Sequence, residues 1–346
     1  MKKEPVTQQD IAKKLKVSRI TVSKALRDHP DISSDMKERV RKAVKEMGYS
    51  PNLIARQLTL GRTNTLGIVV PDLENSFFAY LTDSIIDTAT ESNYHVILTV
   101  SREKEENEKR NIRNLIGMRV DGLLVCVSQF TANAEVFEYA GRMRIPLVFF
   151  DRALKGIGFS YVVFNDKSGT ADALNQLIGC GYRHIAHFSG YTSINIGAER
   201  CNGYREALAR NGIAVRDEWI IEGGYEIEDG FRAFEKLNTL GRLPEIILAV
   251  NDRVALGAYK AIRRAGLRIP EDIGIIGYGF SETAQLFSPT LSIINQDPRK
   301  MGQMAAKMLI DEIQAKSATA PSQVFIEEDF QWNTSVMRRG QGFNPV

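Results

Sequence analysis

The sequence predicts a small all-α head followed by a larger α/β body, and three observations support this fold class. First, 346 residues are too many for one ordinary domain. Second, the first 62 residues carry 15 Lys and Arg against 7 Asp and Glu, a balance of +8, whereas the other 284 carry 30 against 35, a balance of −5. Third, the head shows helical periodicity alone, whereas from Thr65 onward β-rich runs alternate with amphipathic stretches. A basic head on an acidic body predicts that the head contacts a polyanion.

Three short helices are predicted in residues 1–50. Thr7 is the expected N-cap of the first helix, and Ser18 is the N-cap of the second. The third begins near Ser33 or Ser34 and ends at Gly48, which is the expected C-cap. Apolar residues recur at helical spacing and are expected to form one small core; they are Ile11, Ala12, Leu15, Val22, Ala25, Leu26, Met36, Val40, Val44 and Met47.

This arrangement is that of a helix-turn-helix domain, in which the second helix enters the major groove of DNA. Arg19 can bind guanine, Ile20 can contact a thymine methyl group, and Lys24 can reach a base or a phosphate. Hydroxyl groups that can bind phosphates belong to Thr7, Ser18, Thr21 and Ser23. The alternative is a basic three-helix module whose charges are merely solvated. That alternative does not explain why an apolar residue, Ile20, is exposed among the cations.

Residues 51–64 are predicted to form a short hinge helix and a linker. The apolar stretch 51–58 is too short to be stable alone, since isolated helices below about 12–15 residues are marginal in water. It therefore needs a partner surface. An ordinary linker helix packed on the body is the alternative.

The body follows a βαβα order, which predicts parallel sheets with helices on both faces. The expected strands are 66–70, 95–100, 122–127, 147–150, 184–188, 246–250 and 273–278. The expected helices are 77–90, 103–117, 171–180, 198–211, 254–265 and 301–315. In such folds ligands bind beyond the carboxyl ends of the strands.

Several stretches closely resemble the lactose-repressor/galactose-repressor (LacI/GalR) family of bacterial transcription regulators. In the head they are VTQQDIA (6–12), VSRITVSKAL (17–26) and MGYSPN (47–52), and in the body AVND (249–252) and RIPEDI (268–273). The resemblance implies that residues 65–340 form a two-lobed effector domain of the type I periplasmic-binding-protein fold. The chain should cross between lobes near Val163, near Gln296-Asp297 and near Glu327. One lobe would then hold 65–163 and 297–326, and the other 164–295 and 327–340.

The resemblance also implies how the protein engages DNA. The hinge helix should pair with its copy in a homodimer inside the minor groove, with Leu58 wedged between the central base pairs. Asn52 and Ala55 match the family pattern as well. Two heads on one dimer should occupy a near-palindromic double-stranded operator. Repression is the commoner outcome in the family, and activation is the alternative.

A small-molecule effector should bind between the lobes. Asp151 and Arg152 follow the apolar run 147–150, and the other candidates correspond to effector contacts of the family. The full set is Phe77, Asp151, Arg152, Arg200, Tyr225, Asn251, Asp252 and Gln296. Carboxylates and amides accept or donate to hydroxyls, Arg offers a planar fork, and aromatic rings cover apolar faces. This set favours a sugar, with a nucleoside-like ligand as the alternative. Asp252 as a helix cap and Phe77 as a core residue are the structural alternatives.

One departure from the family concerns the strand that ends near Tyr278. The family usually has an Asp pair, or Asp with Asn, after this strand, whereas this chain has Gly279-Phe280-Ser281. The common sugar-binding pattern is therefore incomplete. A different effector is one explanation, and a DNA-bending regulator that ignores small molecules is another.

Other classes of protein are disfavoured. The chain has no Walker loop, dinucleotide glycine fingerprint or His-Glu-x-x-His arrangement, so we expect neither an enzyme nor a cofactor. His184 and His187 flank a short strand and are expected to be structural. Three distant cysteines exclude a disulfide scaffold or zinc site, and no apolar run approaches the roughly 18–20 residues that span a bilayer. A cytoplasmic protein without membrane contact is expected, rather than an exported solute-binding protein.

Overall fold

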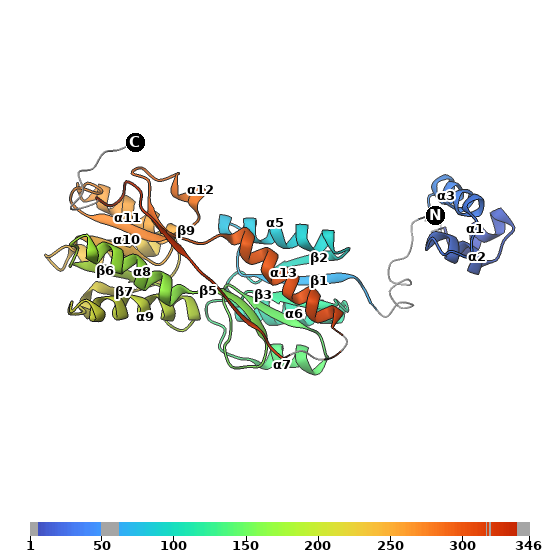
Figure 1. Ribbon diagram of the computed structural model, residues 1–346, viewed down its shortest axis with the longest axis horizontal. Coiled ribbons are helices and arrows are strands. Elements are labelled where there is room, and N and C mark those ends of the chain that lie inside the picture. The colour runs from blue at the N-terminus through green and yellow to red at the C-terminus, as the bar shows by residue number, and fades with distance from the viewer. Residues whose placement is uncertain (1–5, 50–61, 316, 318–319, 338–346) are drawn as a thin grey trace. The chain divides into compact units, whose positions relative to one another are not determined.

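The computed structural model describes residues 6–49, 62–315, 317 and 320–337 (Figure 1). The chain forms two compact units, residues 1–63 and 64–346, which we describe separately. Most of the predicted hinge segment 51–64, with Asn52, Ala55 and Leu58, lies outside the described residues.

The head contains three helices, α1 (Gln8–Leu15), α2 (Arg19–Leu26) and α3 (Ser34–Met47). Thr7 and Asp10 form a capping box at α1, and Ser18 and Ser33 cap the next two helices through their hydroxyls. Gly48 ends α3 with a left-handed φ of 65°, which glycine adopts without strain. The buried core consists of Ile11, Ala12, Val22, Ala25, Val40 and Ala43. The predicted helical head is confirmed.

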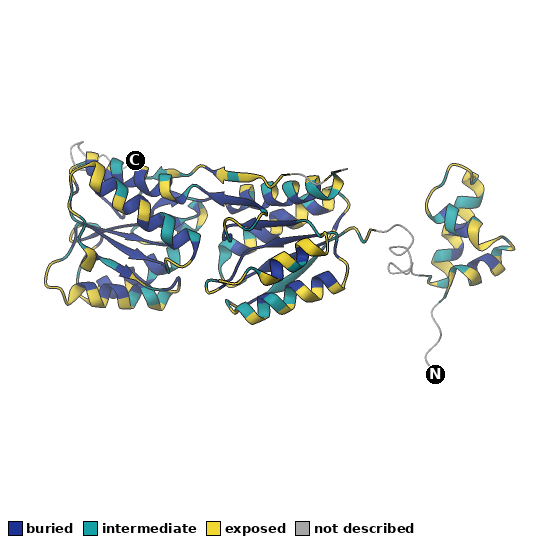
Figure 2. Ribbon diagram, turned by 90° about the horizontal axis from the view of Figure 1, so that it is seen from below, coloured by how far each residue is buried: buried dark blue, intermediate teal, exposed yellow. Residues whose placement is uncertain are grey.

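Lobe 1 of the body is a six-stranded parallel sheet in the order β11-β5-β4-β3-β1-β2. Its strands are β1 (Thr65–Val70), β2 (His95–Val100), β3 (Gly122–Val125), β4 (Leu147–Phe150), β5 (Ser160–Phe164) and β11 (Gln323–Ile326). One core lies between the sheet and α5 (Ser76–Glu91) with α13 (Pro298–Gln314). The other core lies under α6 (Glu105–Gly117) and α7 (Glu135–Arg142). Buried strands between half-exposed helices are visible in Figure 2.

Lobe 2 is a second six-stranded sheet in the order β12-β10-β9-β8-β6-β7, in which β12 is antiparallel. Its strands are β6 (Ile185–Ser189), β7 (Ile220–Glu222), β8 (Ile246–Ala249), β9 (Gly274–Gly279), β10 (Ser292–Asn295) and β12 (Asp329–Gln331). Helices α10 (Ile227–Asn238) and α11 (Asp252–Arg264) cover one face. Helices α8 (Asp166–Gly179) and α9 (Asn195–Arg210) cover the other, and α12 (Ser281–Ala284) is a single turn.

The chain passes between the two sheets three times, between β5 and α8, between β10 and α13, and between β11 and β12. These crossing segments join two lobes, each of which has its own cores on the two faces of its sheet. The body is therefore the predicted two-lobed α/β domain, and that part of the fold prediction is confirmed.

Every strand and helix expected within the described residues occurs, with ends shifted by up to five residues. The pattern missed α7, α10, α12 and the strands β5, β7, β10, β11 and β12. Three of these strands lie at sheet edges and are short, so their alternation of buried and exposed residues is weak. Helix α8 begins at Asp166 rather than near Ala171, because Gly169 is helical here instead of ending a loop.

Candidate functional sites

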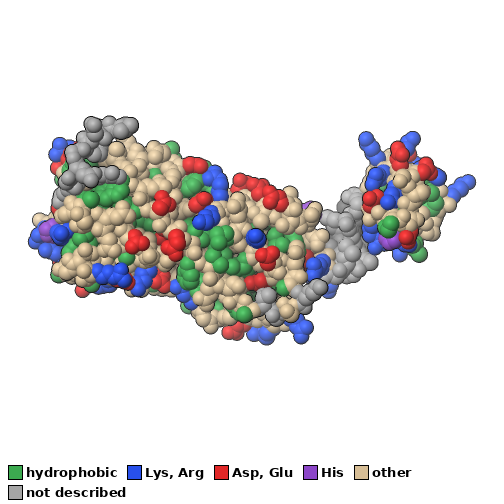
Figure 3. Space-filling model, in the orientation of Figure 1, with side chains coloured by type: hydrophobic (Ala, Val, Ile, Leu, Met, Phe, Trp, Pro, Cys, Tyr) green, Lys and Arg blue, Asp and Glu red, His purple; other side chains and the backbone are tan. Residues whose placement is uncertain are grey.

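The N-terminal turn of α2 presents two side chains to solvent. Ile20 is 67% exposed, and Arg19 is also exposed. No hydrogen bond or ion pair of Arg19 occurs among the described residues. Lys and Arg side chains project from the head in Figure 3. In a major groove, a guanidinium without partners can bind the edge of guanine, and a neighbouring apolar side chain can contact a thymine methyl group.

The other predicted DNA-contacting residues of α1 and α2 take part in contacts within the head. The Ser18 hydroxyl accepts the Thr21 N–H at 3.0 Å and lies 2.9 Å from the Thr21 hydroxyl. Lys24 pairs with Asp31 at 2.8 Å, and Arg27 donates to the Ser23 hydroxyl at 3.1 Å. These contacts are exposed, so water or phosphate oxygens can replace them at small cost.

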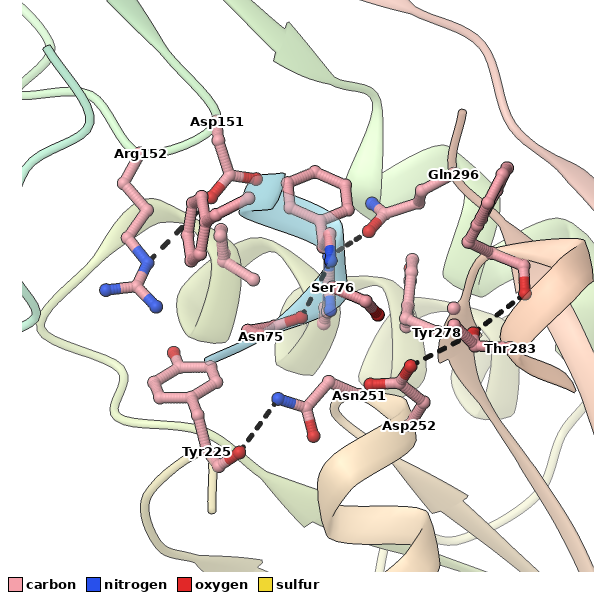
Figure 4. A pocket seen from close by; sticks show the side chains of 16 residues that line it. Asn75, Ser76, Asp151, Arg152, Tyr225, Asn251, Asp252, Tyr278, Thr283 and Gln296 are labelled. Carbon is pink, nitrogen blue, oxygen red and sulfur yellow. Dashed lines mark hydrogen bonds and ion pairs between the residues drawn. The ribbon is translucent and has the colours of Figure 1, made fainter. Parts of the chain in front are cut away.

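All eight residues predicted to bind an effector line one pocket of the body. It leaves about 550 Å³ unfilled by atoms, a figure that includes open solvent at its mouth. Figure 4 shows Asp151 and Arg152 on one side and Tyr225, Asn251 and Asp252 on the other. Sequence reasoning missed eight further lining residues, which are Asn75, Ser76, Phe78, Ile196, Tyr278, Gly279, Phe280 and Thr283.

On the lobe 1 side, the chain turns sharply after β4. Asp151 adopts a φ of 60°, a left-handed conformation that Asp tolerates better than most residues. Its carboxylate accepts the Cys126 thiol at 3.6 Å, and burial raises the pKa of Asp151. The Arg152 guanidinium donates to Glu103 at 2.7 Å and lies 5.2 Å from the Tyr225 ring centroid. Its buried Nε has no hydrogen-bond partner in the described part of the chain.

On the lobe 2 side, Asn251 and Asp252 begin α11. Asn251 is the N-cap, accepting the Val254 N–H at 2.8 Å and donating to the Tyr225 carbonyl at 3.0 Å. The hypothesis that Asp252 caps this helix is therefore wrong. Asp252 instead accepts the Thr283 hydroxyl at 3.1 Å, and burial raises the pKa of its carboxyl group. The amide of Asn251 is fully engaged, whereas Asp252 faces the pocket.

At the back of the pocket, Arg200 is 3% exposed, and each of its three guanidinium nitrogens donates a hydrogen bond. It donates to Asp166 at 2.6 Å, to Gln296 at 3.1 Å and to the Val250 carbonyl. Its guanidinium also stacks 3.5 Å from the Tyr278 ring centroid. Burial raises the pKa of Asp166 to about 6, and Arg200 opposes that shift.

Gly279 and Phe280 stand where the family usually has an Asp pair, or Asp with Asn, and Phe280 takes the second of these positions. Its ring lines the pocket and packs 5.2 Å from the ring of Tyr80 in α5. Arg299 lies 4.3 Å from the Tyr80 ring centroid and 5.2 Å from that of Phe280. Phe77 also lines the pocket while it packs on the lobe 1 core, so both interpretations of Phe77 hold together. This part of the wall is aromatic rather than anionic.

Residues outside the pocket give little sign of other chemistry. His187 is fully buried with Nδ1 3.0 Å from the Leu248 carbonyl, and burial lowers its pKa to about 4. Cys201 lines a separate cavity between α9 and β7 rather than the pocket. Among the described residues, no group of three or more His, Cys, Asp or Glu is placed to hold a metal ion. Within that same part of the chain, no helix has the length and apolarity to span a membrane.

A helix-turn-helix head joined to a two-lobed ligand-binding body defines a class of DNA-binding regulators. Residues 7–52 match the family "Bacterial regulatory proteins, lacI family". Residues 63–334 match "Periplasmic binding proteins and sugar binding domain of LacI family". The chain therefore belongs to the LacI family and is a transcription regulator with a ligand-binding domain. The family predicted from the sequence is confirmed.

The curated relatives are repressors and regulators of similar length. The ribose operon repressor of Haemophilus influenzae is 31% identical over 309 residues, covering 89% of this chain and 92% of the relative. The transcriptional repressor PurR of Vibrio campbellii is 32% identical over 311 residues, covering 90% of this chain and 92% of the relative. These relatives are regulators rather than enzymes, so the match gives no support to an enzymatic activity.

Solved structures match over both units. A lac repressor dimer bound to operator and an anti-inducer has a TM-score of 0.86 at 26% identity, covering 96% of this chain and 99% of that chain. The regulator CelR in complex with cellobiose has a TM-score of 0.73 at 27% identity, covering 95% and 99%.

Proposed function

We propose that the chain is a homodimeric repressor of the bacterial cytoplasm. A small molecule bound between the lobes sets its affinity for operator DNA, and a sugar is the favoured class of ligand. The observation that carries the ligand half is the pair of carboxylates facing one pocket, Asp151 from lobe 1 and Asp252 from lobe 2. In the described part of the chain, their only side-chain hydrogen-bond donors are the Cys126 thiol and the Thr283 hydroxyl. Two such acceptors suit a ligand rich in hydroxyl groups.

The DNA half of the proposal rests on α2. Arg19 and Ile20 supply base contacts in the major groove, and Lys24 a base or phosphate contact. Phosphate contacts come from Thr7, Ser18, Thr21 and Ser23. The proposal also assigns Asn52, Ala55 and Leu58 to the minor groove, where Leu58 unstacks one base step. The lac repressor dimer bound to operator supports this arrangement by analogy.

A ligand couples to DNA through lobe closure, which changes the spacing of the two hinge segments in the dimer. Such couplings between sites are reciprocal and usually amount to about 1–3 kcal/mol. The ribose operon repressor and the CelR–cellobiose complex support a sugar as the effector of this chain. In this proposal, all eight predicted pocket residues contact the sugar or position the groups that do.

A nucleoside-like ligand is the second candidate, and a specific observation favours it. Residues 279–281 themselves supply no carboxylate, and further rings of Phe77, Tyr225 and Tyr278 line the same pocket. Aromatic walls suit the flat face of a base. Relatives named PurR support this candidate as well.

Isothermal titration of the full chain against pentoses, hexoses, disaccharides, nucleobases and nucleosides tests the ligand half. We expect one class to bind, and Asp151→Asn to weaken that binding. Uniformly flat titrations would overturn the effector role and favour a DNA-bending regulator without a small-molecule signal.

Selection of bound sequences from a random DNA pool tests the DNA half. We expect a near-palindromic consensus, and an affinity that falls steeply as salt concentration rises, because basic side chains displace counterions from the phosphates. A flat salt response or an absent consensus would contradict the proposed operator binding.

A further inference from the structure

Each of the three crossings between the lobes contributes one polar side chain to a single cluster. Asp166 follows the crossing after β5, Gln296 lies on the crossing after β10, and Glu328 lies on the crossing after β11. The Gln296 amide donates to Asp166 at 3.3 Å and to Glu328. Rotation of one lobe against the other must pass through these segments, so the cluster sits at the hinge.

Arg200 connects this hinge cluster to the ligand pocket. Its Nη2 donates to Gln296 at 3.1 Å and its Nε donates to Asp166 at 2.6 Å. Arg200 and Gln296 both line the pocket, whereas Asp166 and Glu328 do not. Among the described residues, Gln296 is the hydrogen-bond partner that links Glu328 to the pocket.

The charges of the cluster do not balance if both acids are ionised. Arg200 is the one cation bonded to the cluster within the described residues, and it contacts Asp166 rather than Glu328. The Oε2 atom of Glu328 is buried with no hydrogen-bond partner in that part of the chain. A Cβ atom added at Gly169 would lie 2.0 Å from this oxygen, so Gly169 closes the space beside it. Oε1 accepts a hydrogen bond from Gln296, but a buried carboxylate whose other oxygen has no donor costs more than the neutral acid.

We infer that Glu328 is a positioning residue that acts as a neutral carboxylic acid at the hinge, where it holds Gln296 and, through it, Arg200 in the arrangement seen here. No such role follows from the pocket or the DNA-binding head. In this arrangement of the lobes, the Glu328 carboxyl group therefore keeps its proton. It would release that proton when the cluster at the lobe crossings comes apart.

The ionisable groups around Glu328 are consistent with this assignment. Burial raises the pKa of Glu328 well above its usual value, and the charge of Asp166 acts in the same direction. Arg200 opposes the rise, and exposed Glu327 adds to it. Tyr278 packs beside the cluster with its own pKa raised by burial, so it stays neutral.

The inference predicts the sign of a pH effect on stability. An acid whose pKa is higher in the folded than in the unfolded state binds more protons when folded, so its contribution to stability falls as pH rises. Glu328→Gln has the shape of the neutral acid but cannot ionise. The variant should match the wild type at or below about pH 4, the unfolded pKa range of Glu, and exceed its melting temperature increasingly toward about pH 8, by roughly 2–4 °C.

Glu327→Gln is the matched control, since Glu327 is the exposed neighbour on the same crossing. Its melting temperature should follow the wild type throughout this pH range. If Glu328→Gln were instead less stable than wild type near pH 8, Glu328 would be an ionised and stabilising group, and the inference would be wrong.

Two glycines of α8 provide a second test. An Ala at a helical Gly ordinarily raises helix stability. Gly169→Ala must push the Glu328 carboxyl group away and is expected to lower the melting temperature and abolish the pH effect. At Gly179 an added Cβ meets no atom within 4 Å, so Gly179→Ala should keep the pH effect. Equal behaviour of the two variants would contradict the role of Glu328.

The positioning of Arg200 has its own measurement. The Arg200 Nε proton, assigned in NMR spectra by its loss in Arg200→Lys, should be protected from solvent exchange in the wild type and in Glu328→Gln. It should exchange faster in Glu328→Ala. Undiminished protection in Glu328→Ala would show that Arg200 does not depend on Glu328. None of these experiments uses DNA or an effector, so they succeed or fail independently of the proposed function.

Discussion

The head and the body hold their predicted ligand-contacting arginines in opposite ways. Arg19 of the head is exposed and has no partner among the described residues, whereas Arg200 of the body is buried and donates to Asp166, Gln296 and Val250. A guanidinium without partners can form new bonds to a ligand. A guanidinium whose three nitrogens already donate to buried partners must break existing bonds first, and bonds between buried groups are strong.

The pocket residues also differ in how far their polar groups are engaged within the protein. Asn251, Arg200 and Gln296 are committed to contacts within the protein, while Asp151 and Asp252 have one side-chain donor each in the described part of the chain. We therefore expect the two acids to bind ligand directly and the committed residues to shape the pocket. Sequence comparison alone does not separate these two roles.

The largest expected effect comes from Arg200→Ala. Removing the guanidinium leaves Asp166 buried without its ion-pair partner, which typically costs about 3–5 kcal/mol. Urea unfolding followed by circular dichroism should show this loss, while Arg19→Ala should change stability by less than about 0.5 kcal/mol. Comparable stabilities for the two variants would remove the contrast between the arginines.

A smaller effect is expected from Asp151→Asn. The substitution keeps the shape of the side chain but removes its charge, so bonds from ligand hydroxyl groups should weaken by roughly 1.5–3 kcal/mol. Titration calorimetry with a ligand from the screen measures this change, and Asp172→Asn on α8, outside the pocket, is the control. Unchanged affinity in Asp151→Asn would place the ligand elsewhere.

Arg19→Ala sharpens the comparison from the DNA side. We expect a loss of about 1–3 kcal/mol in operator affinity and relaxed preference at one base position. A gel-shift series with single-base operator variants provides both quantities. A uniform loss across all sequences would instead assign Arg19 to a phosphate.

The smallest expected effect comes from Asp31→Asn, which releases Lys24 from its exposed ion pair. Because exposed pairs contribute little, operator affinity should rise only a few-fold, together with a slightly steeper salt dependence. Fluorescence anisotropy at two salt concentrations measures it, with Asp35→Asn on α3 as the control. A fall in affinity would mean that the pair with Asp31 holds Lys24 in its DNA-binding position.

Much of the molecule could be predicted from the sequence because its determinants are local. Helix caps such as Thr7 and Ser18, and the β-rich runs of the body, act within a few residues of where they occur. The gathering of eight residues in one pocket followed from family resemblance and the strand-end rule. The alternative in which Asp252 caps α11 is wrong, because the neighbouring Asn251 is an equally good cap and takes that position.

The hinge cluster could not be predicted for the opposite reason. Asp166, Gln296 and Glu328 are far apart in the chain and meet only when three crossings come together. Gly169 also obscured the start of α8, since a glycine that makes room for Glu328 resembles a helix breaker in a single sequence. Short edge strands such as β7 and β12 gave too little alternation to be recognised.

The most direct test of the account measures operator affinity with and without the ligand found by titration, for the wild type and for Asp151→Asn. The account predicts that the ligand changes wild-type operator affinity by roughly 5–150-fold. Asp151→Asn should bind the operator equally well without ligand and respond only at much higher ligand concentrations. An operator affinity that no pocket ligand alters would contradict the claim that the body controls the head.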